Sequence, residues 1–92
     1  MAVRAEDIER ALRVALQPST LQVIDDGHLH VGHAGAREGG HFTVRVRSAA
    51  FAGLSRVARH RLVYDALRRE IPSGIHALAI EARAPDETGG TP

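Results

Sequence analysis

Residues 40–80 decide the fold, and they read GHFTVRVRSAAFAGLSRVARHRLVYDALRREIPSGIHALAI. Apolar and polar residues alternate over 41–47, which predicts a strand with one apolar face. Over 55–70 the apolar residues recur at helical spacing, which predicts an amphipathic helix that ends at the Pro-Ser-Gly sequence of 72–74. A second alternation over 76–80 predicts another strand, so this stretch should fold as strand, helix, strand.

The remaining sequence adds a helix and a strand before this unit and a tail after it. Apolar residues at helical spacing predict a helix over residues 4–16, and a short apolar run predicts a strand over 21–24. The tail, residues 85–92, has no apolar content and is expected to be disordered. Residues 1–84 should therefore form the domain.

The predicted order of elements is α-β-β-α-β, which indicates a small α/β (α+β) domain. The first two strands should form an antiparallel pair. The connection through the second helix resembles a crossover, which would make the last strand parallel and the crossover right-handed. Both helices are then expected to cover one face of a three-stranded mixed sheet.

The composition limits the class of protein and of ligand. All twelve basic residues are arginine, the formal net charge is +1 and the pI is about 8.6, less basic than a dedicated nucleic-acid-binding domain. The chain has no cysteine, which excludes a disulfide framework and a thiolate metal site made by this chain alone. No apolar run approaches a membrane span and the N-terminus lacks an apolar signal core, so we expect a cytoplasmic protein that does not bind membranes.

Three of the six histidines, His28, His30 and His33, lie close together in the glycine-rich segment between the first two strands. Imidazole is a common metal ligand, and a long connection in a small domain often has a function. Without cysteine or a fixed helical spacing, these positions do not specify a closed metal site. They are candidate ligands, and three solvated histidines are the alternative.

The other three histidines lie on predicted strands and on the predicted helix. His76, Leu78 and Ile80 are two positions apart along the strand, so their side chains should point to the same face. The ring of His76 is therefore expected on the core side, at the end of the sheet. It would become a metal ligand if the histidine-rich segment folds over it, and a structural histidine at the edge of the core is the alternative. His60 is expected to be structural, with a hydrogen bond to a backbone carbonyl, and His41 is expected to be exposed.

Evidence for a nucleic-acid or catalytic site is thin. Residues 32–35 have the sequence GxxG. In KH domains a GxxG sequence joins two helices and clamps the nucleic-acid backbone. In this chain it lies between two predicted strands, so the match is weak. No serine stands in a nucleophile elbow and no glycine-rich loop joins a strand to a helix, so we expect no enzyme. Arginines that could contact phosphates are Arg45, Arg47, Arg59 and Arg61, although a solvated, partly paired surface explains them as well.

Four motifs in this order resemble the BolA family. The family pattern is a (S/T)HFxV strand, an SxxFxG turn, an RHRxVY helix and a closing (I/V)HAL strand. This chain has GHFTV at 40–44, Ser48 with Phe51 and Gly53, RHRLVY at 59–64 and IHALAI at 75–80. The resemblance covers about residues 8–85, and Gly40 departs from the pattern, where the family often has Ser or Thr.

The resemblance implies a fold akin to the class II KH topology and a role in iron–sulfur metabolism. BolA-like proteins pair with a monothiol glutaredoxin and, with glutathione, share a [2Fe–2S] cluster. The implied ligands are His76 and a histidine of the segment between the first two strands. Counting back from His41 favours His33 and leaves His30 possible, and His28 is not excluded. We expect no cofactor in the isolated protein, which should be a monomer when alone.

Two other functions stay open. BolA-like proteins also act as DNA-binding transcriptional regulators of morphology and stress responses, and duplex DNA would then be the partner. An adaptor that binds glutaredoxin without ligating a cluster is the third possibility. A chain without cysteine can offer only imidazoles, so in the cluster hypothesis the thiolates must come from glutaredoxin and glutathione.

Overall fold

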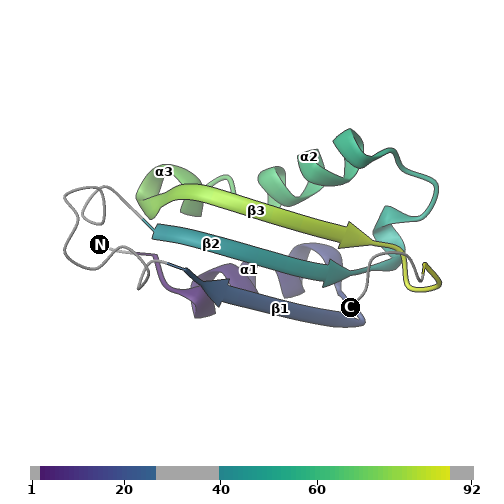
Figure 1. Ribbon diagram of the computed structural model, residues 1–92, viewed down its shortest axis with the longest axis horizontal. Helices are drawn as coiled ribbons and strands as arrows, with labels where there is room; N and C mark the ends of the chain where they lie inside the picture. Colours follow the sequence, from purple (N-terminus) through teal and green to yellow (C-terminus); the bar gives the residue numbers. More distant parts are fainter. Residues whose placement is uncertain (1–2, 27–39, 88–92) are drawn as a thin grey trace.

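The computed structural model describes residues 3–26 and 40–87. The order of its elements confirms the predicted α-β-β-α-β pattern, with two short helical segments in addition (Figure 1). The elements are α1 (Ala5–Leu16), β1 (Thr20–Asp25), β2 (Gly40–Arg47), the 3-10 turn η3 (Ala49–Phe51), α2 (Arg56–Ala66), α3 (Glu70–Gly74) and β3 (Ile75–Arg83).

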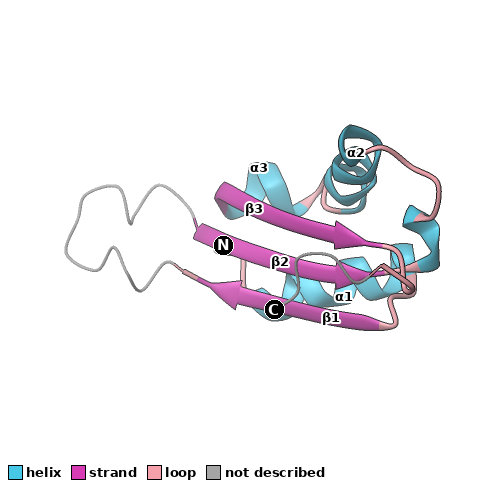
Figure 2. Ribbon diagram, turned by 45° about the vertical axis from the view of Figure 1, so that its right-hand side comes forward, coloured by secondary structure: helices cyan, strands magenta, loops and turns pink. Residues whose placement is uncertain are grey.

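The sheet has the predicted mixed topology. Its strand order is β1-β2-β3, with β1 antiparallel and β3 parallel to the central strand β2. The helices lie on one face of this sheet, and the other face carries no helix among the described residues (Figure 2). The parallel connection from β2 to β3 runs through α2, because only a crossover can return the chain to the same end of the sheet.

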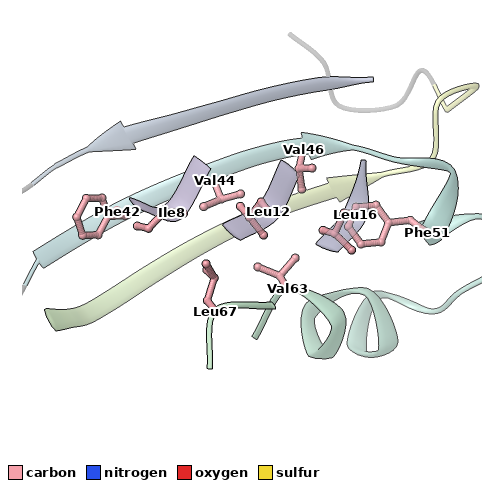
Figure 3. Packing of buried hydrophobic residues seen from close by; sticks show 9 residues of the cluster. All are labelled: Ile8, Leu12, Leu16, Phe42, Val44, Val46, Phe51, Val63 and Leu67. Carbon is pink, nitrogen blue, oxygen red and sulfur yellow. The ribbon is translucent and has the colours of Figure 1, made fainter. Parts of the chain in front are cut away.

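The hydrophobic core lies between the sheet and the helices (Figure 3). The apolar face of β2 contributes alternate residues, and α1 contributes one residue per turn, as the two periodicities predict. The buried cluster consists of Ile8, Leu12, Leu16, Phe42, Val44, Val46, Phe51, Val63 and Leu67.

The second predicted helix is divided in two, which corrects the expected helix over 55–70. α2 ends at Ala66, and α3 begins at Glu70 and contains Pro72. Proline has no N–H and its ring clashes with the preceding turn, so it is disfavoured inside a long helix but tolerated in a first turn. Within α2, Val63 is fully buried, whereas its neighbour Tyr64 is 45% exposed.

No helix in the part of the chain that the structure describes is long and apolar enough to cross a membrane. Near the C-terminus, β3 ends at Arg83 and the described chain continues through Ala84 to Glu87, whereas 88–92 lie outside the described residues. The domain boundary at residue 84 stays a prediction, but Glu87 contacts the domain, as shown below.

Candidate metal centre

One end of the sheet brings together the start of two strands and the end of the third. β2 and β3 are parallel and begin here, at Gly40 and Ile75, and the antiparallel β1 ends here at Asp25. The backbone N–H of Asp26 donates to the carbonyl of His41 over 2.7 Å. Asp26 and Gly40, the described residues on either side of 27–39, therefore both lie at this end of the sheet. We call this edge, with His41 and His76, the histidine end.

His76 lies at a β-bulge and is exposed, which corrects the expectation that its ring faces the core. Gly40 pairs with Ile75, but His41 pairs with Ala77, so β3 has one extra residue at this point. One extra residue in a strand reverses which side chains point to each face of the sheet on the two sides of the bulge. Ile75 and Leu78 therefore both pack against the core, although they are three positions apart.

His41 lies beside His76 on the neighbouring strand. The two ring centroids are 5.2 Å apart and the ring planes are inclined by 45°. His41 alternates with the buried Phe42, so it belongs to the face of the sheet without helices, and it is half-buried rather than exposed as expected. On the same face the Thr43 hydroxyl donates to a carboxylate oxygen of Asp26 over 2.6 Å.

The predicted site is therefore only partly described. His28, His30 and His33 lie outside the described residues, so their convergence with His76 stays a prediction. Within residues 3–26 and 40–87, no group of three or more His, Cys, Asp or Glu side chains is arranged to hold a metal ion. His60 is half-buried on α2, and its expected hydrogen bond to a carbonyl stays a prediction.

The opposite end of the sheet holds a network of arginine contacts, which we call the arginine end. Arg59 on α2 donates through Nη1 and Nη2 to the two carboxylate oxygens of Glu87, over 2.6 and 2.7 Å. It also donates to the carbonyls of Leu54 and Ala82, and its side chain is only 13% exposed. The Ala84 N–H donates to the same carboxylate over 3.0 Å. Sequence analysis missed this pair, because it had assigned Glu87 to the tail.

These contacts shift the ionisation of both partners. The hydrogen bonds from Arg59, followed by the one from the Ala84 N–H, lower the pKa of Glu87 from 4.5 to about 2. The hydrogen bond to Glu87 raises the pKa of Arg59. Glu87 is therefore ionised at neutral pH, and the bidentate pair stabilises the connection that follows β3.

Ser48 completes the arginine end. Its hydroxyl is buried, donates to the carbonyl of Leu16 over 2.6 Å and accepts from the N–H of Ala50 over 3.1 Å. The Ser48 hydroxyl thus provides a hydrogen-bond donor to a carbonyl at the C-terminus of α1 and caps the N-terminus of η3. This gives the serine of the SxxFxG motif a structural role.

Three of the four arginines considered for nucleic-acid binding have contacts within the protein. Arg47 donates to the carbonyls of Ala84, Pro85 and Glu87. On the open face of the sheet, Arg45 forms an ion pair with Glu81 over 3.1 Å. Arg59 belongs to the arginine end described above, and Arg61 is exposed on α2. Their role in binding DNA stays a prediction, and the contacts of Arg47 and Arg59 favour a structural role.

A groove of about 860 Å³ lies between α1 and the α2–α3 region, and no histidine is among its lining residues. It is lined by apolar residues and by charges of both signs, so its chemistry specifies no ligand. The charged lining residues are Asp7, Arg10, Asp65, Arg68, Arg69 and Glu70.

Comparison with known proteins identifies the family. The family model described as BolA-like protein matches residues 12–87. The chain belongs to the BolA-like protein family. This match includes all four motifs quoted above.

Several relatives of this BolA-like protein cover most of its length. A Sinorhizobium protein named for its position in the cobS 5′ region is 48% identical over 85 residues, covering 89% of this chain and 91% of that protein. Chloroplastic BOLA1 of Arabidopsis thaliana is 39% identical over 89 residues, covering 92% of this chain and 56% of that protein. SufE-like protein 1 of the same plant is 43% identical over 90 residues, covering 91% and 24%. This chain therefore spans about half the length of BOLA1 and about a quarter of SufE-like protein 1. Because BOLA1 is named as chloroplastic, the relatives do not establish the compartment, and the cytoplasmic location of this chain stays a prediction.

Solved structures confirm the fold. The BolA domain of SufE1 from Arabidopsis thaliana has a TM-score of 0.81 and 44% identity, covering 96% of this chain and 99% of that one. BolA1 from the same plant has a TM-score of 0.81 and 39% identity, covering 96% and 98%. Yeast Fra2 has a TM-score of 0.64 and 26% identity, covering 89% and 80%.

Proposed function

We propose that this BolA-like protein pairs with a monothiol glutaredoxin and, with glutathione, shares a [2Fe–2S] cluster. The observation that carries the proposal is the position of His76. Its side chain is exposed at the start of β3, at the end of the sheet where Asp26 and Gly40, the described residues on either side of 27–39, also lie. Membership of the family whose motifs imply this function supports it.

The donor atoms of this chain fit a cluster held between two proteins. The chain has no cysteine, and its described residues include no group of three or more metal-ligating side chains. It can therefore contribute imidazole ligands, from His76 and from His33 or His30. Glutaredoxin and glutathione would contribute the thiolates, which iron–sulfur clusters require.

The choice of the second histidine rests on the family resemblance. Counting back from His41 favours His33 and leaves His30 possible. His28, His30 and His33 are two, four and seven positions after Asp26. An imidazole side chain adds to the reach of the backbone, so chain length alone excludes none of the three.

Imidazole ligation suits a cluster that is cargo rather than a permanent cofactor. A histidine leaves iron as a neutral group, whereas a cysteine leaves as a thiolate. Histidine ligation also raises the reduction potential of a two-iron cluster, as in Rieske centres. We therefore expect the shared cluster to be more readily transferred than one held by thiolates alone.

The experiment is to mix this protein with cluster-loaded monothiol glutaredoxin and to record visible absorption and circular dichroism. We expect a new, stable spectrum that His76→Ala abolishes. Parallel variants His33→Ala and His30→Ala should identify the second ligand, since only one of them should alter the spectrum. His60→Ala, on α2, is the matched control and should leave the spectrum unchanged.

An unchanged glutaredoxin spectrum with the unsubstituted protein would contradict the proposal. A salt titration of binding to duplex DNA would then test the regulator hypothesis, which requires a steep loss of affinity with salt. If instead this protein binds cluster-free glutaredoxin, and the histidine variants bind equally well without altering the cluster spectrum, the adaptor hypothesis replaces cluster ligation.

A further inference from the structure

We propose that His41 and His76 together bind one divalent transition-metal ion with tetrahedral preference, such as Zn²⁺, in the protein without a partner. The inference rests on the contact between the two imidazole rings across β2 and β3. It does not depend on the proposed function, because it uses described residues of this chain only and requires no glutaredoxin.

The ring separation matches two imidazoles that share an ion. Zinc binds imidazole nitrogen at about 2.0–2.1 Å in tetrahedral geometry, which separates the centroids of two ligating rings by about 5 Å. The centroids of His41 and His76 are 5.2 Å apart, and the rings are tilted by 45° rather than stacked in parallel. The separation of the two rings therefore fits a shared ion, on which one nitrogen of each ring would have to converge.

Both histidines are carried by backbone that is fixed by its neighbours. His41 follows Gly40 in the central strand and precedes Phe42, which is 2% exposed in the core. His76 follows Ile75, which packs against the same core. The Asp26 N–H donates to the carbonyl of His41. Ligands on rigid strands lose little conformational entropy when an ion binds.

The bulge in β3 gives the site its access to solvent. With His76 as the extra residue, Ala77 takes the position opposite His41, and the His76 side chain is exposed. The described residues offer no third ligand, so water or a small anion must complete the coordination. Two protein ligands leave two coordination positions open, so the site would differ from closed four-ligand structural zinc sites and should exchange its ion.

The ion would occupy the histidine that the proposed function assigns to the shared cluster. His76 could then ligate either the single ion or the shared cluster, but not both at once. Only the cluster-bound form needs a partner protein. Metal binding measured in the absence of glutaredoxin therefore tests the His41–His76 site independently of cluster sharing.

The test uses the full chain with His28, His30 and His33 each replaced by Gln, so that these three cannot bind the added metal. Zn²⁺ alone is titrated at pH 7.5 by calorimetry, and Co²⁺ absorption reports the coordination geometry. In this background His41→Gln and His76→Gln each remove one proposed ligand. His60→Gln, on α2, removes an imidazole that is not part of the site.

We expect one Zn²⁺ per chain, at least a tenfold loss of affinity with His41→Gln or His76→Gln, and no change with His60→Gln. Absence of Zn²⁺ binding at 1 mM, or a loss below threefold for either variant, would overturn the proposal. As a check that does not depend on substitutions, the ring NMR signals of His41 and His76 in the natural sequence should shift together on addition of Zn²⁺. Signals that stay unchanged at saturating Zn²⁺ would also overturn it.

Discussion

The two ends of the sheet carry polar side chains of opposite character. At the arginine end, Arg59, Glu87 and Ser48 bind each other or backbone groups, and Ser48 is fully buried. At the histidine end, His76 is exposed on a bulge beside His41. Hydrogen bonds within the protein favour stability, whereas an exposed imidazole is available to a ligand. We propose that the family motifs serve stability at the arginine end and binding at the histidine end, and the following substitutions test this separation.

The largest effect on stability is expected from Phe51→Ala at the arginine end. Phe51 is fully buried in η3, next to Ser48, so its truncation should leave a cavity and cost about 3–5 kcal/mol of unfolding free energy. Chemical denaturation measures this value. Val57→Ala is the control, because Val57 is 62% exposed and should change stability by less than about 0.5 kcal/mol. Equal effects of the two would refute the assignment of Phe51 to the core.

Ser48→Ala should have the second largest effect. It removes the donor to the Leu16 carbonyl and the acceptor for the Ala50 N–H, and should cost about 1–3 kcal/mol because these groups lose a partner near the core. Ser73→Ala is the matched control, since Ser73 is exposed and donates only to the carbonyl of Arg69 within its own helical turn. Denaturation curves that coincide for the two variants would contradict the structural role of Ser48.

Glu87→Gln should reduce stability in a pH-dependent way. The folded-state pKa of Glu87 lies at about 2, below its ordinary 4.5, so its contribution is present above pH 4.5 and is lost as the pH falls towards 2. The melting temperature of the variant should be lower than that of the natural sequence at pH 6, and the difference should shrink as the pH falls from 4.5. A difference that does not vary with pH would show that ionisation of Glu87 is irrelevant.

The smallest effect on stability is expected at the histidine end. His76→Gln removes an exposed side chain, so the free energy of unfolding should change by less than about 0.5 kcal/mol. Thermal melting measured beside Glu87→Gln gives the comparison directly. A loss as large as that of Glu87→Gln at pH 6 would mean that His76 is structural, the alternative that the strand pattern leaves open.

Periodicity predicted the three strands and the first helix, and the geometry of connections predicted the sheet topology, because these depend on local alternation and on chain direction. The division of the second helix into α2 and α3 was not predicted. The direction of His76 was not predicted, since the strict alternation shared with Leu78 and Ile80 ignores the bulge. The sequence does contain a sign of it. Ile75 and Leu78 are both apolar but three positions apart, so both can face the core only if the strand has an extra residue.

The arginine end illustrates what local patterns cannot predict. Glu87 lies in a segment of proline, glycine and polar residues, whose composition indicates disorder. Its partner Arg59 is 28 positions earlier, on a helix face that resembles an ordinary solvated surface. A single long-range ion pair leaves no periodic pattern in a sequence, so only the three-dimensional arrangement identifies it.

The most direct test of the separation between the two ends is the visible circular dichroism of the cluster shared with a monothiol glutaredoxin, recorded with His76→Gln and with Glu87→Gln at a temperature where both are folded. We predict that His76→Gln, with unchanged melting, abolishes the shared-cluster spectrum, and that Glu87→Gln, with lowered melting, retains it. Retention of the full spectrum by His76→Gln would contradict the account.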